Sequence, residues 1–377
     1  MRCFLIRNPR DATKQIPFVM SEATDLDIGL VRRGYSATGG AEAYLLRLAS
    51  GLRSRGCKLT LYTTVDWPPD RWPFGDLVRL KATEPLEFAR GFQQKRKPGQ
   101  VVLSLDRVPG CDVFRAGDGV HAAWLQRRSQ FESAWKSRLR IFNLKHPALL
   151  ALERQVLASA KLVIANSKMV AKEIVHWHGV PESRIRIVPN GIGEAIPRIS
   201  RVEARRRLDI PEDAFCALFV GTGWERKGLR FALEAVEMLG GGTLLVIAGR
   251  GRTKRYRSPH AKFLGIVQDL PALYTAADVF TLPTIYDPFS NACLEALAAG
   301  LPVVTTSANG FSEILTPGVH GHVVDPGDVQ GLADALEFWK TRDPAKTATD
   351  CMLLAKDYSI ERNVEATLQV LREVIRS

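Results

Sequence analysis

The chain has 377 residues, of which 46% are hydrophobic and 24% are charged, and its formal net charge is +12. This composition excludes a disordered chain, a collagen and a small disulfide-bonded scaffold, and the length predicts two domains. No apolar run approaches the ~20 residues that cross a bilayer. Six widely spaced cysteines without a C-x-x-C pair favour unpaired thiols in a reducing cytosol.

The charge is concentrated in the first half of the chain. Residues 1–200 contain 32 Lys and Arg against 18 Asp and Glu, a net +14, whereas residues 201–377 contain 20 against 22, a net −2. Such asymmetry favours an anionic partner for the first half, which could be a nucleic acid, an anionic membrane or an anionic substrate. A basic domain that is merely soluble is the alternative.

The first 24 residues form an N-terminal extension that is detached from the pattern after them. The first convincing strand is at 26–32, and Met20 would be a plausible natural start. We therefore expect residues 1–19 to be a translation-start artefact or a loose extension.

From residue 25 onwards, short apolar runs alternate with helical stripes of 3.6-residue period, such as 45–52 and 229–239. This alternation predicts an α/β fold with parallel sheets covered on both faces. Because it occurs twice, we expect two doubly wound Rossmann-like domains facing a central cleft, at 25–195 and 196–359, with a C-terminal helix at about 360–377 packing back on the first. Strands are predicted at 28–31, 59–63, 101–105, 162–165, 185–188, 216–220, 244–248, 279–282 and 303–305.

A glycine-rich turn, GYSATGGAE at 34–42, joins the first strand to the first helix. The paired Gly39 and Gly40 would let the backbone approach a phosphate at the positive end of that helix. The turn is not G-x-G-x-x-G, and no acidic residue suited to a ribose follows the second strand, so a dinucleotide site is poorly supported. A tight turn without a ligand is the alternative.

A second glycine-rich turn, GTGWERKG at 221–228, follows the first strand of the second half. Its Arg226 and Lys227 lie near a helix start, where the helix dipole disfavours cations. A bound anion would explain this placement, and an arginine fork beside a lysine suits a diphosphate. A solvated basic turn is the alternative.

The segment YDPFSNACLEALAAG at 286–300 places Asp287 and Glu295 eight residues apart. We expect the N–H groups of residues 290–292 to point at an anion from the first turn of a helix at 292–299. Asp287 could accept hydrogen bonds from sugar hydroxyls, and Glu295 from a ribose. The alternative is two unrelated surface acids, with Asp287 capping the helix.

Together with VPNGI at 188–192, these motifs resemble glycosyltransferase family 4 from residue 26 to the C-terminus. The resemblance implies a GT-B fold and transfer that retains the anomeric configuration without a covalent enzyme intermediate. Asp287 replaces the usual glutamate and Ser290 the usual glycine, which leaves the sugar open. The resemblance implies nucleotide-sugar contacts at Gly39, Gly40, Gly221, Arg226, Lys227, Val267, Asp287, Phe289, Ser290, Asn291, Ala292 and Glu295.

The segment LDRVPGCDVFRAGD at 105–118 more narrowly resembles glucosyltransferases of the lipopolysaccharide core. This resemblance implies transfer of glucose from UDP-glucose to a heptose of the phosphorylated inner core. Asp118 then matches the acidic residue at the reaction centre, with His121 as the runner-up. Either would contact the reacting sugar.

Three other functions compete with this one. The first is a family 4 transferase for another polysaccharide or glycolipid, with UDP, GDP or ADP as the donor carrier. The second, a basic nucleic-acid-binding protein, is disfavoured because no nucleic-acid motif is found. The third, an inactive carbohydrate-binding relative, is disfavoured by the presence of Arg226, Lys227 and Glu295.

Neither a metal ion nor another cofactor is expected. Arg226 and Lys227 would neutralise the departing diphosphate, a task that a metal bound by Asp-x-Asp performs in other glycosyltransferases. The only such triplet here, at 25–27, lies at the start of the first strand and not in a strand-end loop.

The segment 124–146 has the pattern of a basic amphipathic helix that could lie on an anionic membrane. The acceptor of the resembled class is assembled at the inner membrane, so we expect a cytoplasmic protein that associates peripherally with its anionic surface. An ordinary helix with its aromatic face in the core is the alternative. The expected membrane contacts are Trp124, Arg127, Arg128, Phe131, Trp135, Lys136, Arg138 and Arg140.

Overall fold

The computed structural model describes residues 26–36, 40–82, 84–132, 145–193, 196–197 and 199–376. The expected extension at 1–24 lies outside these ranges. Among the described helices, none is both long enough and apolar enough to cross a membrane.

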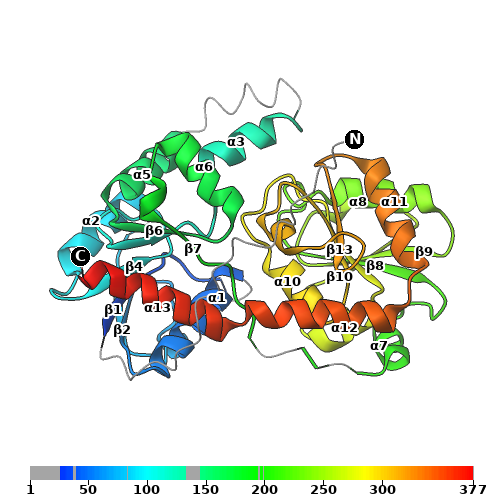
Figure 1. The fold of residues 1–377 in the computed structure, drawn as a ribbon, viewed down its shortest axis with the longest axis horizontal. Coiled ribbons are helices and arrows are strands. Elements are labelled where there is room, and N and C mark those ends of the chain that lie inside the picture. The colour runs from blue at the N-terminus through cyan, green and yellow to red at the C-terminus, as the bar shows by residue number, and fades with distance from the viewer. Residues whose placement is uncertain are drawn as a thin grey trace, which may run out of the picture.

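The first sheet has seven parallel strands in the order β3-β2-β1-β4-β5-β6-β7. Helices lie against both of its faces (Figure 1). The strands are β1 (Asp27–Val31), β2 (Lys58–Thr64), β3 (Asp76–Leu80), β4 (Val101–Ser104), β5 (Val113–Arg115), β6 (Leu162–Ala165) and β7 (Ile185–Ile187). The helices are α1 (Gly40–Arg53), α2 (Pro85–Lys95), α3 (His121–Ser129), α5 (Lys145–Ser159) and α6 (Lys168–His178).

The second sheet has six parallel strands in the order β10-β9-β8-β11-β12-β13. Its strands are β8 (Phe215–Val220), β9 (Thr243–Ala248), β10 (Ala261–Gly265), β11 (Val279–Leu282), β12 (Val303–Thr306) and β13 (Gly321–Val324). The helices of the second half are α7 (Arg201–Arg207), α8 (Leu229–Leu239), α9 (Leu270–Ala276), α10 (Asn291–Ala298), α11 (Val329–Lys340), α12 (Pro344–Ala355) and α13 (Ile360–Arg376).

The prediction of two doubly wound parallel sheets is confirmed. In each sheet the strand order reverses beside the first strand, between β1 and β4 and between β8 and β11. Ligands of open α/β sheets bind beyond the carboxyl ends of the strands at such reversals. The two glycine-rich turns follow β1 and β8, so both lie at these points.

The core of the first domain is completed by the last helix of the chain. Apolar residues of α1 recur every three or four positions, and the stripe formed by Leu45, Leu48 and Leu52 is fully buried. The matching stripe of α13, which includes Val364 and Leu368, packs into the same cluster. Figure 1 shows α13, in red, running along the first domain after α12 leaves the second.

The chain crosses between the domains twice, and the two crossings are hydrogen-bonded to each other. The N–H of Ile192 donates to the carbonyl oxygen of Tyr358 at 3.0 Å, and the N–H of Ile360 donates to that of Ile192 at 2.6 Å. A Cβ on Gly191 would lie 2.6 Å from the Cα of Ile360, so this close approach requires glycine.

Candidate active site

The turn after β8 brings Lys227 back over the end of its own strand. Gly228 precedes α8 with φ +74°, and a Cβ there would lie 1.9 Å from the carbonyl oxygen of Pro283. A Cβ on Gly221 would lie 2.5 Å from Cδ of Lys227. Both positions therefore require glycine. The absence of side chains there lets Lys227 lie across the end of the strand.

Lys227 forms an ion pair with Asp287. Its Nζ lies 3.3 Å from Oδ2 of Asp287, and the two side chains are only 12% and 9% exposed. The residues are 60 positions apart but follow the neighbouring strands β8 and β11. The cation expected at a diphosphate and the acid expected at a sugar thus meet at one site.

The backbone of Arg226 fastens this turn to the end of β11. Its carbonyl oxygen accepts hydrogen bonds from the N–H of Ile285 and the hydroxyl of Thr284, both at 2.9 Å. The half-buried Arg226 forms no ion pair with any described residue. Its guanidinium is therefore available to an anionic ligand.

The start of α10 differs from the expectation at one position. Ser290 caps the helix by accepting the N–H of Cys293, and its own N–H donates to Oδ1 of Asn309 at 3.3 Å. The prediction that the Ser290 N–H points at an anion is therefore wrong, because that donor is used within the fold. Asn291 and Ala292 do open the helix, and the cap is Ser290, not Asp287.

The residues around Asn291 connect the start of α10 to the first domain. The amide of Asn190 donates to Oδ1 of Asn291 at 2.7 Å and to the carbonyl oxygen of Phe289 at 3.1 Å. Asn291 in turn donates to the carbonyl oxygen of Gly40 at 3.5 Å. Gly39, the other member of the predicted glycine pair, lies outside the described residues.

Glu295 lies one helical turn further along α10, at the junction of the domains. The hydroxyl of Tyr274 donates to its Oε2 at 3.2 Å, and Arg47 of α1 lies 3.9 Å from its Oε1. Burial raises the pKa of Glu295, an effect opposed by Arg47. The half-buried carboxylate can accept hydrogen bonds from hydroxyls of a ligand. Val267, half-buried after β10, packs on the core of the second domain.

Asp118 belongs to the loop between β5 and α3. Its side chain is 53% exposed, and its Oδ2 lies 3.9 Å from one nitrogen of Arg32 and one of Arg107. The next residue, Gly119, has φ +72°, and a Cβ there would lie 2.2 Å from the hydroxyl of Tyr286. Since Gly119 follows Asp118 and Tyr286 precedes Asp287, these two acidic residues lie on segments that are in contact.

His121 is placed differently from Asp118. It is 9% exposed, and its Nε2 lies 3.0 Å from Nδ1 of His146. Burial lowers the pKa of His121 to about 4. The ring is thus neutral near pH 7 and is used in packing, an arrangement that favours Asp118 as the residue facing a reacting sugar.

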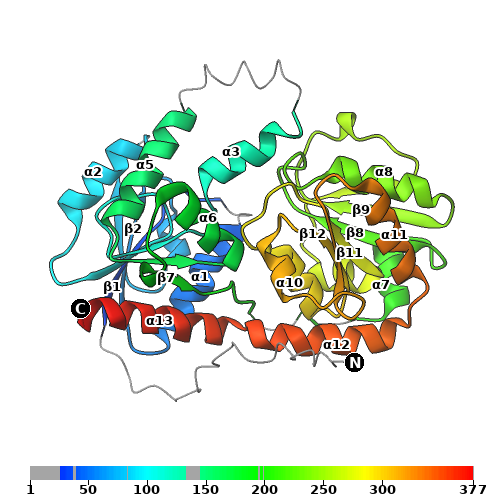
Figure 2. The same ribbon diagram turned by 45° about the horizontal axis from the view of Figure 1, so that its top comes forward.

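The aromatic residues of α3 pack between the domains. Trp124 stacks on Tyr286 with ring centroids 6.2 Å apart, and Phe131 meets Phe231 of the second domain edge-on at 5.7 Å. Figure 2 shows α3 projecting from the first domain toward the second. Both rings are partly buried, and each has an aromatic partner across the domain junction.

The basic residues of the same helix are also partnered. Arg127 pairs with Glu173 at 2.9 Å and lies over the ring of Tyr286, and Arg128 pairs with Glu132. The remaining expected membrane contacts lie outside the described residues, and they are Trp135, Lys136, Arg138 and Arg140.

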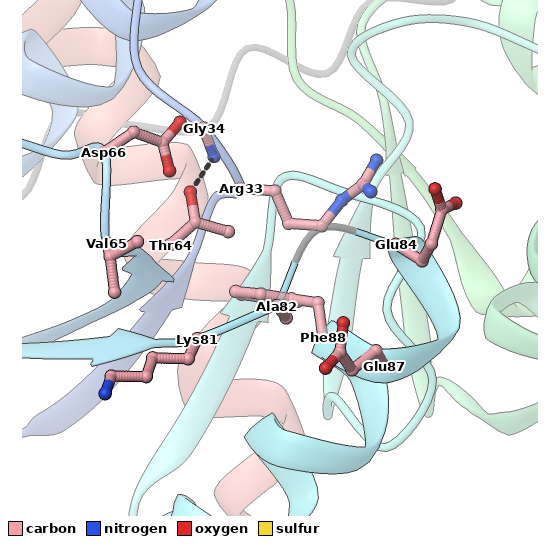
Figure 3. A pocket seen from close by; sticks show the side chains of 10 residues that line it. All are labelled: Arg33, Gly34, Thr64, Val65, Asp66, Lys81, Ala82, Glu84, Glu87 and Phe88. Carbon is pink, nitrogen blue, oxygen red and sulfur yellow. Dashed lines mark hydrogen bonds between the residues drawn. The ribbon is translucent and has the colours of Figure 1, made fainter.

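A cavity of about 730 Å³ opens beyond the carboxyl ends of β1, β2 and β3, and sequence reasoning missed it. Figure 3 shows Arg33 reaching toward Glu84, with Phe88 below and Lys81 pointing away. The hydroxyl of Thr64 accepts the N–H of Gly34 at 2.9 Å and shapes the wall. The residues that line the cavity follow three different strands and share no sequence motif. Only the position of the cavity at the carboxyl ends of the strands could have indicated it.

Comparison with known proteins agrees with this architecture. Residues 38–195 match the model described as Glycosyltransferase Family 4, and residues 214–339 match that of Glycosyl transferases group 1. The protein is therefore a glycosyltransferase of the GT-B fold and belongs to the family that its motifs predicted.

Three relatives are informative. The lipopolysaccharide glucosyltransferase WaaG of Escherichia coli K12 is 27% identical over 83% of this chain and 89% of its own length. A WaaG crystal structure matches 91% of this chain and 99% of its own with a TM-score of 0.76 at 22% identity. The lipopolysaccharide core biosynthesis glycosyltransferase LpsE of Rhizobium meliloti is 27% identical over 80% of this chain and 86% of its own. Anabaena HepE in complex with UDP-glucose matches 91% of this chain and 99% of its own with a TM-score of 0.69 at 20% identity.

Proposed function

We propose that the protein transfers glucose from UDP-glucose to a heptose of the lipopolysaccharide inner core, with retention of configuration. The observation that carries the proposal is the meeting of Lys227 and Asp287 beside the loop that bears Asp118. Two relatives named for lipopolysaccharide synthesis support the acceptor class, and a structural neighbour in complex with UDP-glucose supports the donor.

In this mechanism the second domain holds the donor. Lys227 and Arg226 neutralise the charge that develops on the departing UDP, which lowers the barrier because they act most strongly in the transition state. Asp287 binds hydroxyls of the transferred sugar, and Glu295 binds the ribose. Asp118 contacts the incoming acceptor hydroxyl from the first domain.

The cavity beyond β1, β2 and β3 holds the acceptor glycan. Its mixed lining suits a phosphorylated sugar, since Arg33 can bind a phosphate, Glu84 can accept hydrogen bonds from sugar hydroxyls, and the Thr64 hydroxyl can donate one. Arg33→Ala should raise KM for a phosphorylated acceptor and leave UDP affinity unchanged. An unchanged acceptor KM would remove this assignment.

The reaction requires no metal ion, because the two cations of the 221–228 turn serve the diphosphate. Activity should be complete in excess EDTA. Loss of activity that magnesium restores would overturn this part of the proposal.

The protein works in the cytoplasm at the anionic face of the inner membrane, which it contacts through the basic residues between 135 and 140. Anionic vesicles should bind the protein, and neutral vesicles should not. Equal binding to both would contradict an electrostatic membrane contact.

The test of the whole proposal is a donor screen with purified lipid-linked core oligosaccharide. Release of UDP, GDP or ADP from the corresponding glucose donors is measured, and mass spectrometry identifies the added sugar. We expect UDP release and a product heavier by one hexose. Transfer only to another polysaccharide or glycolipid, or from another donor, would replace this function by a different family 4 activity.

A further inference from the structure

Glu153 of α5 is the most completely enclosed carboxylate near the acceptor side of the site. It is 1% exposed, and four hydrogen bonds converge on its two oxygens. The N–H of His121 lies 3.0 Å from both, Nε of Arg107 donates to Oε1 at 2.8 Å, and Nε2 of His178 lies 3.2 Å from Oε2. These donors come from the loop after β4, the start of α3 and the end of α6.

A buried charge of this kind is costly unless every lone pair is used. Burial alone would raise the pKa of Glu153, but the hydrogen bonds from His178, Arg107 and His121 outweigh that effect and the pKa is lowered. The carboxylate is therefore charged at neutral pH. Its charge also complements the positive N-terminal end of α3.

The same carboxylate reaches Asp118 through one intermediate side chain. While Nε of Arg107 is held by Glu153, one terminal nitrogen donates to the carbonyl oxygen of Gly119 at 3.0 Å and the other lies 3.9 Å from Oδ2 of Asp118. Glu153 thus fixes the loop 116–121 at its end, through the His121 N–H, and in its middle, through Arg107.

This loop is also where the first domain meets the second. The N–H of Val120 donates to the hydroxyl of Tyr286 at 2.8 Å, and Gly119 lies directly beneath that hydroxyl. A shift of the loop would move Asp118 relative to the segment that carries Asp287. Reaction rates fall steeply with misplacements of about 1 Å.

We infer that Glu153 is the positioning residue of the acceptor side: through Arg107 and the His121 N–H, it holds Asp118 in place against the donor site. Glu153 itself touches no substrate. The inference rests on the proposed role of Asp118, and it predicts that Glu153 governs the transfer step but not donor binding.

The test uses Glu153→Gln, which keeps the size of the side chain and removes its charge. We expect kcat for transfer to fall by roughly 10–100-fold, the range typical of residues that orient a reacting group, while UDP affinity stays within about twofold. Arg107→Lys keeps the charge but cannot bridge Glu153 and Gly119 at once. It should likewise lower kcat and leave UDP affinity unchanged. It also serves if Glu153→Gln does not fold.

The matched control is Asp112→Asn. Asp112 is a carboxylate 2.5 Å from Arg96 that is less completely buried than Glu153. It precedes β5 whereas Asp118 follows it, so the two lie at opposite ends of that strand. The substitution should lower the melting temperature and leave kcat within about twofold of the unaltered protein. If Asp112→Asn lowers kcat as Glu153→Gln does, general destabilisation explains both and the inference fails.

A double-variant cycle separates this inference from the proposed function. If Glu153 acts through Asp118, then adding Glu153→Gln to Asp118→Asn should cost little further activity. Fully additive losses, a normal kcat in Glu153→Gln, or equal losses of kcat and UDP affinity would each overturn the positioning role. A fully active Asp118→Asn would instead overturn the proposed role of Asp118, whatever Glu153→Gln does.

Discussion

The two domains build their halves of the site in different ways. In the second domain, each polar residue of the donor site lies in one of two strand–turn–helix segments, 221–228 and 286–300, whose shapes are set by nearby glycines and a helix cap. In the first domain, Asp118 is held by Arg32 and Arg107, which follow other strands. A site made of short segments can be recognised in a sequence together with its contacts, whereas Asp118 could be named from its segment but its contact with Arg32 could not.

Removing the central cation of the donor half should have the largest effect. Lys227→Ala should lower kcat by roughly 10²–10³-fold, the usual cost of deleting one group that stabilises charge in the transition state. Lys254→Ala, on an exposed turn after β9, is the control and should retain normal turnover. Rates of UDP release measure both variants, and near-normal turnover in Lys227→Ala would contradict a diphosphate role.

The contact between the halves can be broken at Gly119. A Cβ there would meet the hydroxyl of Tyr286 at 2.2 Å and Pro288 at 2.7 Å, so Gly119→Ala should lower the free energy of unfolding by about 2–4 kcal/mol and reduce transfer. Gly99→Ala has a similar φ but open space around it, so it should cost only about 1 kcal/mol. Urea titrations measure the free energy of unfolding of both variants. Equal losses would show that the contact between the domains does not contribute to stability.

The buried cluster of the acceptor half should respond to pH. The pKa of His121 is lowered from 6.5 to about 4 by burial and the nearby Arg107, so between these values the unfolded chain binds a proton that the folded protein does not. The free energy of unfolding contributed by His121 is therefore present above pH 6.5 and is lost as the pH falls toward 4. Glu153 also faces this ring and favours its protonation, whereas His146 opposes it, so only Glu153 offsets the lowering of the pKa.

Comparison of the unaltered protein with His121→Asn isolates this effect. Between about pH 6.5 and 4.5 the variant should lose about 2 kcal/mol less stability in urea unfolding. Parallel pH curves for the unaltered protein and His121→Asn would show that the imidazole is not held neutral.

The smallest effect is expected at the ribose end of the donor half. Glu295→Ala should weaken UDP binding by about tenfold, or about 1.4 kcal/mol, because one charged acceptor is lost. Glu337→Ala, at an exposed position of α11, is the control. Calorimetric titration with UDP measures both, and unchanged affinity in Glu295→Ala would remove the ribose assignment.

Most of the fold could be predicted because buried parallel strands have continuous apolar sequences. All nine predicted strands are present, and β6 and β11 have the predicted bounds. The missed strands are β3, β10 and β13 at sheet edges and the three-residue β5. Edge strands are half-exposed, as in Asp76–Leu80, where two charged residues are exposed, and so lack a continuous apolar run.

The candidate site was less accessible to sequence reasoning wherever a partner is remote. The use of the Ser290 N–H by Asn309, the stacking of Trp124 on Tyr286 and the burial of Glu153 all depend on residues between 19 and 162 positions away. A basic, aromatic helix such as 121–129 has the same pattern whether its rings face lipid or a second domain. Only the three-dimensional contacts separate the two.

The return of α13 to the first domain has a consequence for biosynthesis. The first domain emerges from the ribosome first, yet its core lacks the apolar face of Val364, Leu368 and Leu371 until the last residues are translated. The second domain, whose sheet ends at Val324, has all its strands earlier. The order of completion is thus the reverse of the order of synthesis, and a chain that ends after α12 but before α13 would have a complete second domain and an incomplete first domain.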